Sequence, residues 1–210
     1  MILKNYYWYF QSALSPKFCD DLINHATGKD LQKALTGQYT SKEEKGKKLT
    51  KKDLLDLKKK RDSNVVWLND AWIYKEIHPY IHEANKRAGW NFDWDWSESA
   101  QFTKYSKKQF YDWHCDSYQE PFDSKDKNFH NKIRKLSVTC SLSDPKEYTG
   151  GELEFQFRDS QEPTSTRVCK EILPKGSIVV FPSHVWHRVK PVTKGTRYSL
   201  VIWNLGYPFK

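Results

Sequence analysis

The sequence lacks any apolar run near twenty residues, so no segment is long enough to cross a membrane as a helix. It also lacks a charged and then apolar leader, because residues 1–10 form an amphipathic aromatic stretch. The four cysteines are scattered without any CxxC pair: Cys19, Cys115, Cys140 and Cys169. Zinc fingers and CxxC redox motifs are therefore excluded, and reduced thiols fit the cytoplasmic location that we expect.

Aromatic residues, by contrast, make up 15% of the chain, with 9 Trp, 12 Tyr and 11 Phe among 210 residues. Such side chains bury large areas and form pocket walls, which excludes a disordered chain. The length suits one domain with its own core, and the sequence has no internal repeat or second-domain boundary. We therefore expect residues 1–210 to form a single domain.

Positive charge is concentrated in one part of the chain. Of the formal net charge of +9, much of the excess lies between Lys42 and Arg61. We interpret this Lys-rich insertion, at about residues 38–62, as a solvated and partly mobile segment. A basic docking surface for an acidic partner is the alternative interpretation.

Two helices are predicted in the first half of the chain. The first begins at Ser15 and Pro16, an N-cap followed by a first-turn proline, and Gly28 is a plausible end. The second covers residues 69–89, which have helical apolar spacing. Pro79 falls inside that pattern and predicts a break or kink.

From residue 90 onward the sequence changes to short β-strands divided by turn signals. The candidate strands are residues 90–96, 99–105, 109–116, 135–144, 151–157, 176–182, 187–192 and 197–205. They predict a mainly β (α+β) fold, an antiparallel jelly roll or double-stranded β-helix with N-terminal helices packed outside. Residues 1–89 would form a leader of one aromatic strand and helices, and residues 90–210 the jelly-roll core.

A metal-binding pattern lies in the candidate strand at residues 109–116. On a strand, His114 and Asp116 point to the same face, while Cys115 points to the other. One face thus presents an imidazole and a carboxylate that can bind one cation. His-x-Asp alone is a weak signal, since chance matches are common, so a third ligand is needed.

The third ligand has to come from one of the remaining histidines: His25, His78, His82, His130, His184 and His187. We choose His187, which begins a short strand that is expected to turn at residues 193–196 and to return antiparallel, carrying Arg197 to the same cavity. His184 lacks this ten-residue spacing and is expected to be a hydrogen-bonded turn residue. Two histidines and one carboxylate leave open coordination positions, as in non-haem iron oxygenases. A buried arginine needs an anion, and a carboxylate fits its fork.

HCD at residues 114–116 followed by HRVKPVTKGTR at residues 187–197 resembles the HxD…H…R/K signature of iron(II)- and 2-oxoglutarate-dependent dioxygenases. Within that superfamily the chain is similar to the prolyl 4-hydroxylase branch, including the PKHD-type hydroxylases. The resemblance spans Arg61 to Trp203 and includes RDSNVVWL, RKLSVTCSLSD, the Gly150–Gly151 turn and PKGSIVVFPS. The Lys-rich insertion has no place in the family pattern.

The resemblance implies a role for eight residues. Iron(II) would be held by His114, Asp116 and His187. The distal carboxylate of 2-oxoglutarate would pair with Arg197, with Tyr105 assisting. The peptide-substrate side would be lined by Tyr111, Arg134 and Trp203. For Arg134 a salt bridge is an equally good explanation, and for Tyr111 and Trp203 packing in the core is the alternative.

The implied reaction uses dioxygen to hydroxylate a C–H bond while 2-oxoglutarate becomes succinate and CO2, with ascorbate as a candidate reductant. We expect a prolyl or related residue of a peptide or protein as substrate, and no membrane partner. A small-molecule oxygenase acting on a free amino acid or metabolite is the alternative. A nucleic-acid demethylase of the AlkB type is disfavoured, because that family has a further arginine where this chain has Trp203. An inactive jelly-roll binding module is also disfavoured, because a protein without turnover would not need Arg197.

Overall fold

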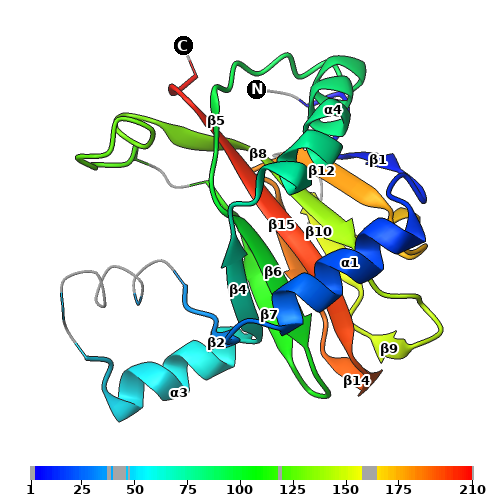
Figure 1. Ribbon diagram of the computed structural model, residues 1–210. Helices are drawn as coiled ribbons and strands as arrows, with labels where there is room; N and C mark the ends of the chain where they lie inside the picture. Colours follow the sequence, from blue (N-terminus) through cyan, green and yellow to red (C-terminus); the bar gives the residue numbers. More distant parts are fainter. Residues whose placement is uncertain are drawn as a thin grey trace.

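The computed structural model describes residues 3–36, 39, 46, 48–117, 120–157 and 165–209 (Figure 1). Part of the Lys-rich insertion lies outside the described residues. Antiparallel strands make up the larger part of the regular structure, with helices α1 (Pro16–Thr27), α3 (Lys51–Lys60) and α4 (Ala71–Arg87) around them. No helix within the described ranges is both long and apolar enough to span a membrane.

Helix α1 has the predicted ends. The Ser15 side chain accepts a hydrogen bond from the Phe18 backbone N–H at 3.1 Å, and the helix ends at Gly28. Of the break or kink predicted at Pro79, the break is wrong, because α4 continues through this proline. Burial of the α4 apolar side chains accounts for this, since several such side chains together offset the cost of about 3 kcal/mol for one interior proline. These buried residues are Ile73, Ile77, Ile81 and Ala84.

The second half of the Lys-rich insertion is a regular helix, which the interpretation as a partly mobile segment did not anticipate. The overlooked signal is a capping box at the start of α3. The Asp53 backbone N–H donates to the Thr50 hydroxyl at 3.1 Å, and the Thr50 backbone N–H donates to the Asp53 carboxylate at 2.9 Å. Leu57 is the one α3 residue with a buried side chain.

The strands form two main sheets in which every pairing is antiparallel. The large sheet has the order β1 (Trp8–Phe10), β12 (Ile178–Pro182), β8 (Ile133–Ser141), β15 (Arg197–Gly206), β6 (Ala100–Tyr105), β4 (Asn64–Leu68) and β2 (Gln32–Lys33), and β5 (Trp96–Ser97) pairs with β15. The small sheet has the order β11 (Ser165–Val168), β10 (Leu153–Phe157), β13 (Trp186–Val189), β7 (Phe110–His114) and β3 (Arg61–Asp62). Strands β14 (Val192–Gly195) and β9 (Tyr148–Gly150) pair separately, and a 3-10 turn covers Lys170–Ile172.

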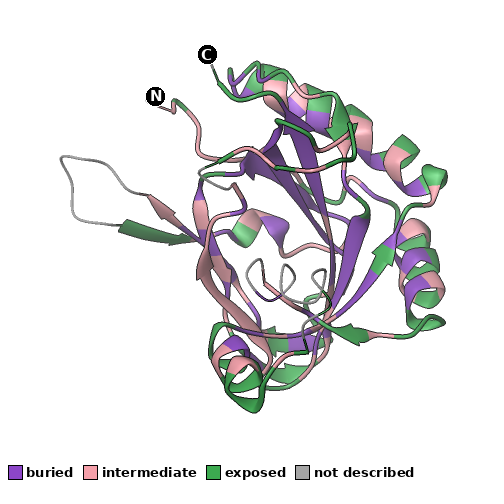
Figure 2. Ribbon diagram, turned by 90° about the vertical axis from the view of Figure 1, so that its left-hand side faces the viewer, coloured by how far each residue is buried: buried purple, intermediate pink, exposed green. Residues whose placement is uncertain are grey.

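The large sheet is buried on both faces because its side chains alternate between two cores. On β12, Ile178 and Val180 pack with the helices, whereas Val179 and Phe181 pack in a second cluster with residues of the small sheet. Figure 2 shows the central strands of this sheet buried over most of their length. This arrangement places the large sheet between the outer helices and the small sheet.

Residues 90–96 are not a strand, except for Trp96 in the short β5. The aromatic alternation that suggested a strand serves instead to cover the end of α4. The Asn85 side chain holds the Phe92 backbone through two hydrogen bonds of 2.9 Å, and the Trp90 indole N–H donates to the Asn5 carbonyl at 2.7 Å. Trp90 and Phe92 therefore belong to the helix-side core.

Candidate metal and cosubstrate site

The two histidines of the predicted cluster lie opposite each other on neighbouring strands of the small sheet. His187 on β13 is directly opposite His114 on β7, and their ring centres are 4.1 Å apart. His114 Nδ1 donates to the Asp112 carbonyl at 2.7 Å, and His187 Nδ1 donates to the Val185 carbonyl at 3.0 Å. A carbonyl can only accept, so Nδ1 carries a proton in both rings, and in a neutral ring Nε2 then carries the lone pair that a metal would need.

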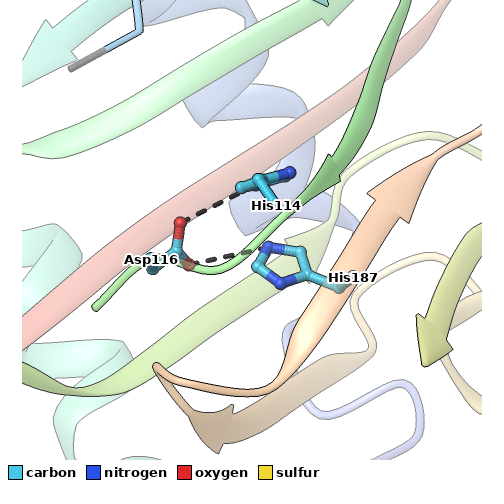
Figure 3. A group of neighbouring side chains, drawn as sticks. All are labelled: His114, Asp116 and His187. Carbon is cyan, nitrogen blue, oxygen red and sulfur yellow. Dashed lines mark ion pairs between the residues drawn. The ribbon is translucent and has the colours of Figure 1, made fainter. Parts of the chain in front are cut away.

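Asp116 completes the cluster from a position beyond the end of β7. The strand ends at His114, so the expected alternation along one strand does not aim the carboxylate. Instead the Asp116 backbone N–H donates to the Ser183 carbonyl at 2.8 Å, and the Ser137 hydroxyl donates to Asp116 Oδ2 at 2.7 Å. Asp116 then lies 3.7 Å from His114 Nε2 and 3.6 Å from His187 Nε2 (Figure 3).

The donor set fits a divalent transition metal. One nitrogen from each imidazole and one carboxylate oxygen lie within 4.8 Å of one another. Burial and the neighbouring His187 hold the pKa of His114 well below its ordinary value. Burial alone would raise the pKa of Asp116, but the nearby imidazoles and the Ser137 hydrogen bond outweigh it and lower that pKa. A neutral imidazole beside an ionised carboxylate is the protonation state that binds a metal.

Arg197 approaches from the large sheet. The expected antiparallel return after residues 193–196 is wrong, because β14 pairs with β9, and β15 pairs with β6 and β8 rather than with β13. Arg197 is opposite Tyr105 in the β6–β15 register, and its guanidinium lies 5.5 Å from the Tyr105 ring centre. Only 2% of Arg197 is exposed. It donates to the Ser199 hydroxyl at 3.2 Å, and no carboxylate within the described ranges forms an ion pair with it.

Polar side chains line the inner face of the large sheet, and the sequence interpretation missed them. They alternate with core residues and are almost fully buried: Gln101, Thr103, Ser137, Thr139, Ser141 and Ser199. These side chains lie next to one another on three neighbouring strands, since Ser199 on β15 is opposite Thr103 on β6 and Ser141 on β8. A period-two series of small polar residues within otherwise apolar strands was the available signal.

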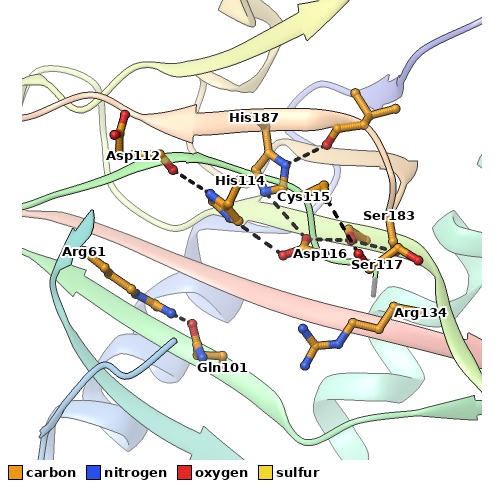
Figure 4. A network of polar contacts seen from close by, with 12 residues as sticks. Arg61, Gln101, Asp112, His114, Cys115, Asp116, Ser117, Arg134, Ser183 and His187 are labelled. Atoms are coloured by element: carbon orange, nitrogen blue, oxygen red, sulfur yellow. Dashed lines mark hydrogen bonds and ion pairs between the residues drawn. The ribbon is translucent and has the colours of Figure 1, made fainter. Parts of the chain in front are cut away.

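Tyr111 stacks directly on a metal-cluster residue. Its ring lies 3.5 Å from the His114 ring centre at an interplanar angle of 14°. Tyr111 also contacts Arg61, a residue that was not predicted to belong to the site and that is opposite Tyr111 in the β3–β7 register. The Arg61 guanidinium is 4.4 Å from the Tyr111 ring centre and donates to Gln101 Oε1 at 2.6 Å. Figure 4 shows Arg61 beside the cluster.

Arg134 and Trp203 form a second group on the large sheet. Arg134 makes a two-pronged ion pair with Glu98, at 2.5 Å and 2.7 Å, so the salt bridge weighed for it in the sequence exists. Its guanidinium also lies 4.0 Å from the Trp203 ring centre. The buried Trp203 Nε1 has no hydrogen-bond partner among the described residues. A buried indole N–H without an acceptor costs free energy.

Several histidines and all the cysteines lie outside the cluster. His184 is in the turn between β12 and β13, and its ring contacts Phe209 edge-on at 6.4 Å. His187, three residues later, reaches the cluster because β13 pairs with β7, and Phe181 packs against its ring with 4.7 Å between centres. The four cysteines are free thiols, consistent with the sequence interpretation.

Comparison with known proteins identifies the family. The 2OG-Fe(II) oxygenase superfamily matches residues 100–204, half of the chain. A PKHD-type hydroxylase from Synechococcus sp. (strain CC9605) is 38% identical over 110 residues, which is 52% of this chain and 42% of that protein. The match thus spans less than half the length of this curated relative.

Solved structures share the fold. A viral collagen prolyl hydroxylase from Paramecium Bursaria Chlorella virus-1, in a 2OG complex, aligns over 97% of both chains with a TM-score of 0.62 and 21% identity. A prolyl hydroxylase from Trichoplax adhaerens, in complex with a hypoxia inducible factor peptide fragment, aligns over 96% of this chain and 84% of that one, with a TM-score of 0.61 and 13% identity. The predicted jelly roll is thereby confirmed. The chain belongs to the 2OG-Fe(II) oxygenase superfamily and resembles its PKHD-type branch.

Proposed function

We propose that this protein is an iron(II)- and 2-oxoglutarate-dependent hydroxylase that acts on a prolyl or related residue of a peptide or protein. Iron(II) would be held by His114, Asp116 and His187, whose donor atoms converge within 4.8 Å. When bound, iron and 2-oxoglutarate supply, with dioxygen, the oxidising chemistry that hydroxylates a C–H bond and releases succinate and CO2.

The buried charge of Arg197 is the observation that carries this proposal. A guanidinium that is 2% exposed and has no carboxylate partner within the described ranges calls for an anion. A dicarboxylate fits, because one carboxylate can pair with the arginine fork while the other end of the molecule reaches the metal cluster. Tyr105, in register with Arg197, would help to hold it.

The other residues of the site hold the ligands in place. The backbone carbonyls of Asp112 and Val185 orient the two imidazoles, and Ser137 orients the carboxylate. The Phe155 and Phe181 rings pack near His187, with ring centres 6.3 Å and 4.7 Å away, and limit its rotation and the access of water.

A peptide substrate is supported by the group around Trp203. Its unpaired indole N–H could donate to a substrate carbonyl, and Arg134 and Glu98 supply further polar groups beside it. Trp67 lies 6.0 Å from the Trp203 ring centre and is 49% exposed, so an apolar surface continues outward. The fold shared with a peptide-bound prolyl hydroxylase agrees with this choice of substrate.

Anaerobic titration with iron(II) and 2-oxoglutarate tests the metal and cosubstrate roles. The intact protein should develop the visible charge-transfer absorption of a keto acid chelated to iron, whereas His187→Ala and Asp116→Ala should not. Both variants should keep the circular dichroism spectrum of the intact protein, because the two residues belong to the site rather than to the apolar core. No absorption from the intact protein would refute the proposal.

The substrate class is tested by aerobic turnover. Proline-containing peptides, free amino acids and host proteins are incubated with the enzyme, and mass spectrometry reads the gain of one oxygen atom. Oxygen gain on a peptidyl residue supports the proposal. Oxygen gain on free amino acids alone would favour the small-molecule alternative.

A further inference from the structure

We infer that the exposed surface of helix α3 is a docking surface for an acidic segment of a polypeptide substrate. This surface, here called the α3 lysine surface, consists of Lys51, Lys52, Lys58 and Lys59 around the exposed Leu54 and Leu55. The inference deepens the proposed function, because it assigns the charge of the segment that flanks the hydroxylated residue.

The two leucines are surrounded by lysines on the helix. Leu55 is 63% exposed and has Lys51 and Lys52 one turn before it and Lys58 and Lys59 one turn after it. Leu54 is 46% exposed. Exposed apolar side chains surrounded by lysine ammonium groups suit a partner that carries both carboxylates and apolar groups.

Most of the positive charge on α3 is not neutralised locally. Lys59 pairs with Asp56 at 3.1 Å, but Lys51, Lys52 and Lys58 form no ion pair within the described part of the chain. Asp53 is used in the capping box with Thr50. The surface therefore keeps an excess of positive charge for a partner.

Stability of the helix does not explain the lysines at its start. Lysines in the last turn favour the helix dipole, whereas Lys51 and Lys52 occupy the first turn, where positive charge opposes it. Arginine and aromatic side chains, which stack on nucleic-acid bases, are absent from Lys51–Lys60. These features favour an acidic polypeptide over a nucleic acid.

A chain of contacts connects this surface to the metal cluster. Helix α3 packs on β3 and β7, and Arg61 of β3 follows directly after the last residue of α3. Arg61 lies over the Tyr111 ring, which stacks on His114. Figure 1 shows α3 projecting at the edge of the body beside the strands that carry the site. Helix α3 therefore borders the strands that carry the metal cluster, and this is where we place the segment that flanks the hydroxylated residue.

Fluorescence anisotropy tests the inference on the full-length protein loaded anaerobically with iron(II) and 2-oxoglutarate. The probe is a labelled peptide with one proline followed by glutamates and a leucine, and its matched control has glutamines in place of the glutamates. The acidic probe should bind more tightly than the control, and its affinity should fall as salt is added. Equal binding of the two probes would overturn the inference.

Lysine variants locate the binding. Lys51→Gln, Lys52→Gln and Lys58→Gln together should weaken binding of the acidic probe about tenfold and flatten its salt dependence. The matched control removes the same charge from exposed lysines elsewhere: Lys75→Gln, Lys86→Gln and Lys194→Gln. It should change the affinity by less than about twofold. An equal loss in both triple variants would show that net charge alone matters, and would overturn the inference.

Two further measurements separate the remaining outcomes. Tighter binding of a single-stranded oligonucleotide than of the acidic peptide, lost in the α3 triple variant, would replace the inference with a nucleic-acid surface. Succinate release without peptide is measured in parallel on the intact protein. Its absence would refute the proposed function, whereas the binding data alone decide the inference about α3.

Discussion

The Ser137 hydroxyl donates a hydrogen bond of 2.7 Å to the Asp116 carboxylate, so the large sheet directly supports the metal cluster of the small sheet. Ser137 lies on β8 and is fully buried, and its hydroxyl is also 2.9 Å from that of Ser183. This contact fixes one carboxylate oxygen and leaves the orientation of Asp116 dependent on the packing of the two sheets.

Ser137→Ala should therefore weaken iron(II) binding about tenfold without unfolding the protein, since loss of such a supporting hydrogen bond costs roughly tenfold or more in metal affinity. Isothermal titration under anaerobic conditions measures the change. Ser141→Ala, which removes a buried hydroxyl from the same face of β8, is the matched control. Unchanged iron affinity in Ser137→Ala would show that Ser183 and the backbone orient Asp116 sufficiently.

Arg197→Ala should raise the 2-oxoglutarate requirement far more than it disturbs iron affinity. A hydrogen bond to a charged group contributes about 1.5–3 kcal/mol, so the apparent dissociation constant for 2-oxoglutarate should rise by one to two orders of magnitude. Titration monitored by the charge-transfer absorption measures this shift. Equal loss of iron and 2-oxoglutarate affinity would indicate that Arg197 supports the fold.

Gly151→Ala should impair 2-oxoglutarate binding through Arg197. Gly151 has φ +67°, and an added Cβ would lie 3.0 Å from Arg197 Cδ and 3.0 Å from Val192 Cγ2. The substitution should also destabilise the protein by about 1–2 kcal/mol through backbone strain. Gly89→Ala is the control, because its φ of +74° imposes similar strain while no atom lies within 4 Å of the added Cβ.

Thermal unfolding and 2-oxoglutarate titration of both glycine variants separate strain from contact. A lower melting temperature is expected in both, and weaker 2-oxoglutarate binding only in Gly151→Ala. Normal 2-oxoglutarate affinity in Gly151→Ala would mean that Arg197 can shift without functional cost.

Trp203→Phe should lower turnover of a peptide substrate while leaving peptide-independent succinate release nearly unchanged. The substitution keeps an aromatic ring for the contact with Arg134 and removes the unpaired indole N–H. Loss of one hydrogen bond to substrate predicts a loss of roughly tenfold in kcat/KM. Retention of full peptide turnover would assign Trp203 to packing only.

Much of the architecture was predictable from local signals. The Ser15–Pro16 start of α1 and most of the β-strands follow from capping residues and period-two alternation. The strand predicted at residues 90–96 was wrong, because an alternating series of aromatic residues has the same pattern in a β-strand and in a loop that packs over a helix end. The break predicted at Pro79 was wrong too, since burial of the α4 face decides whether the helix continues.

Some residues of the candidate site could likewise be predicted from the sequence, and others could not. The sequence pattern named His114, Asp116, His187 and Arg197, and the structure brings them to facing sheets. The antiparallel return that was expected to carry Arg197 there does not exist, because β15 pairs with β6 and β8 instead. Arg61 was out of reach, because its place over Tyr111 depends on the pairing of β3 with β7, strands that are distant along the chain.

The sequence by itself determined the kinds of ligand, their order along the chain and the side-chain alternation that turns polar residues inward on β6, β8 and β15. Only the tertiary structure decided that Asp116 is oriented by Ser137 and Ser183, and that Arg197 reaches the site from the opposite sheet. The physical reason is that local spacing sets where a side chain points within one strand. Burial of both faces of the large sheet decides which distant strands come together.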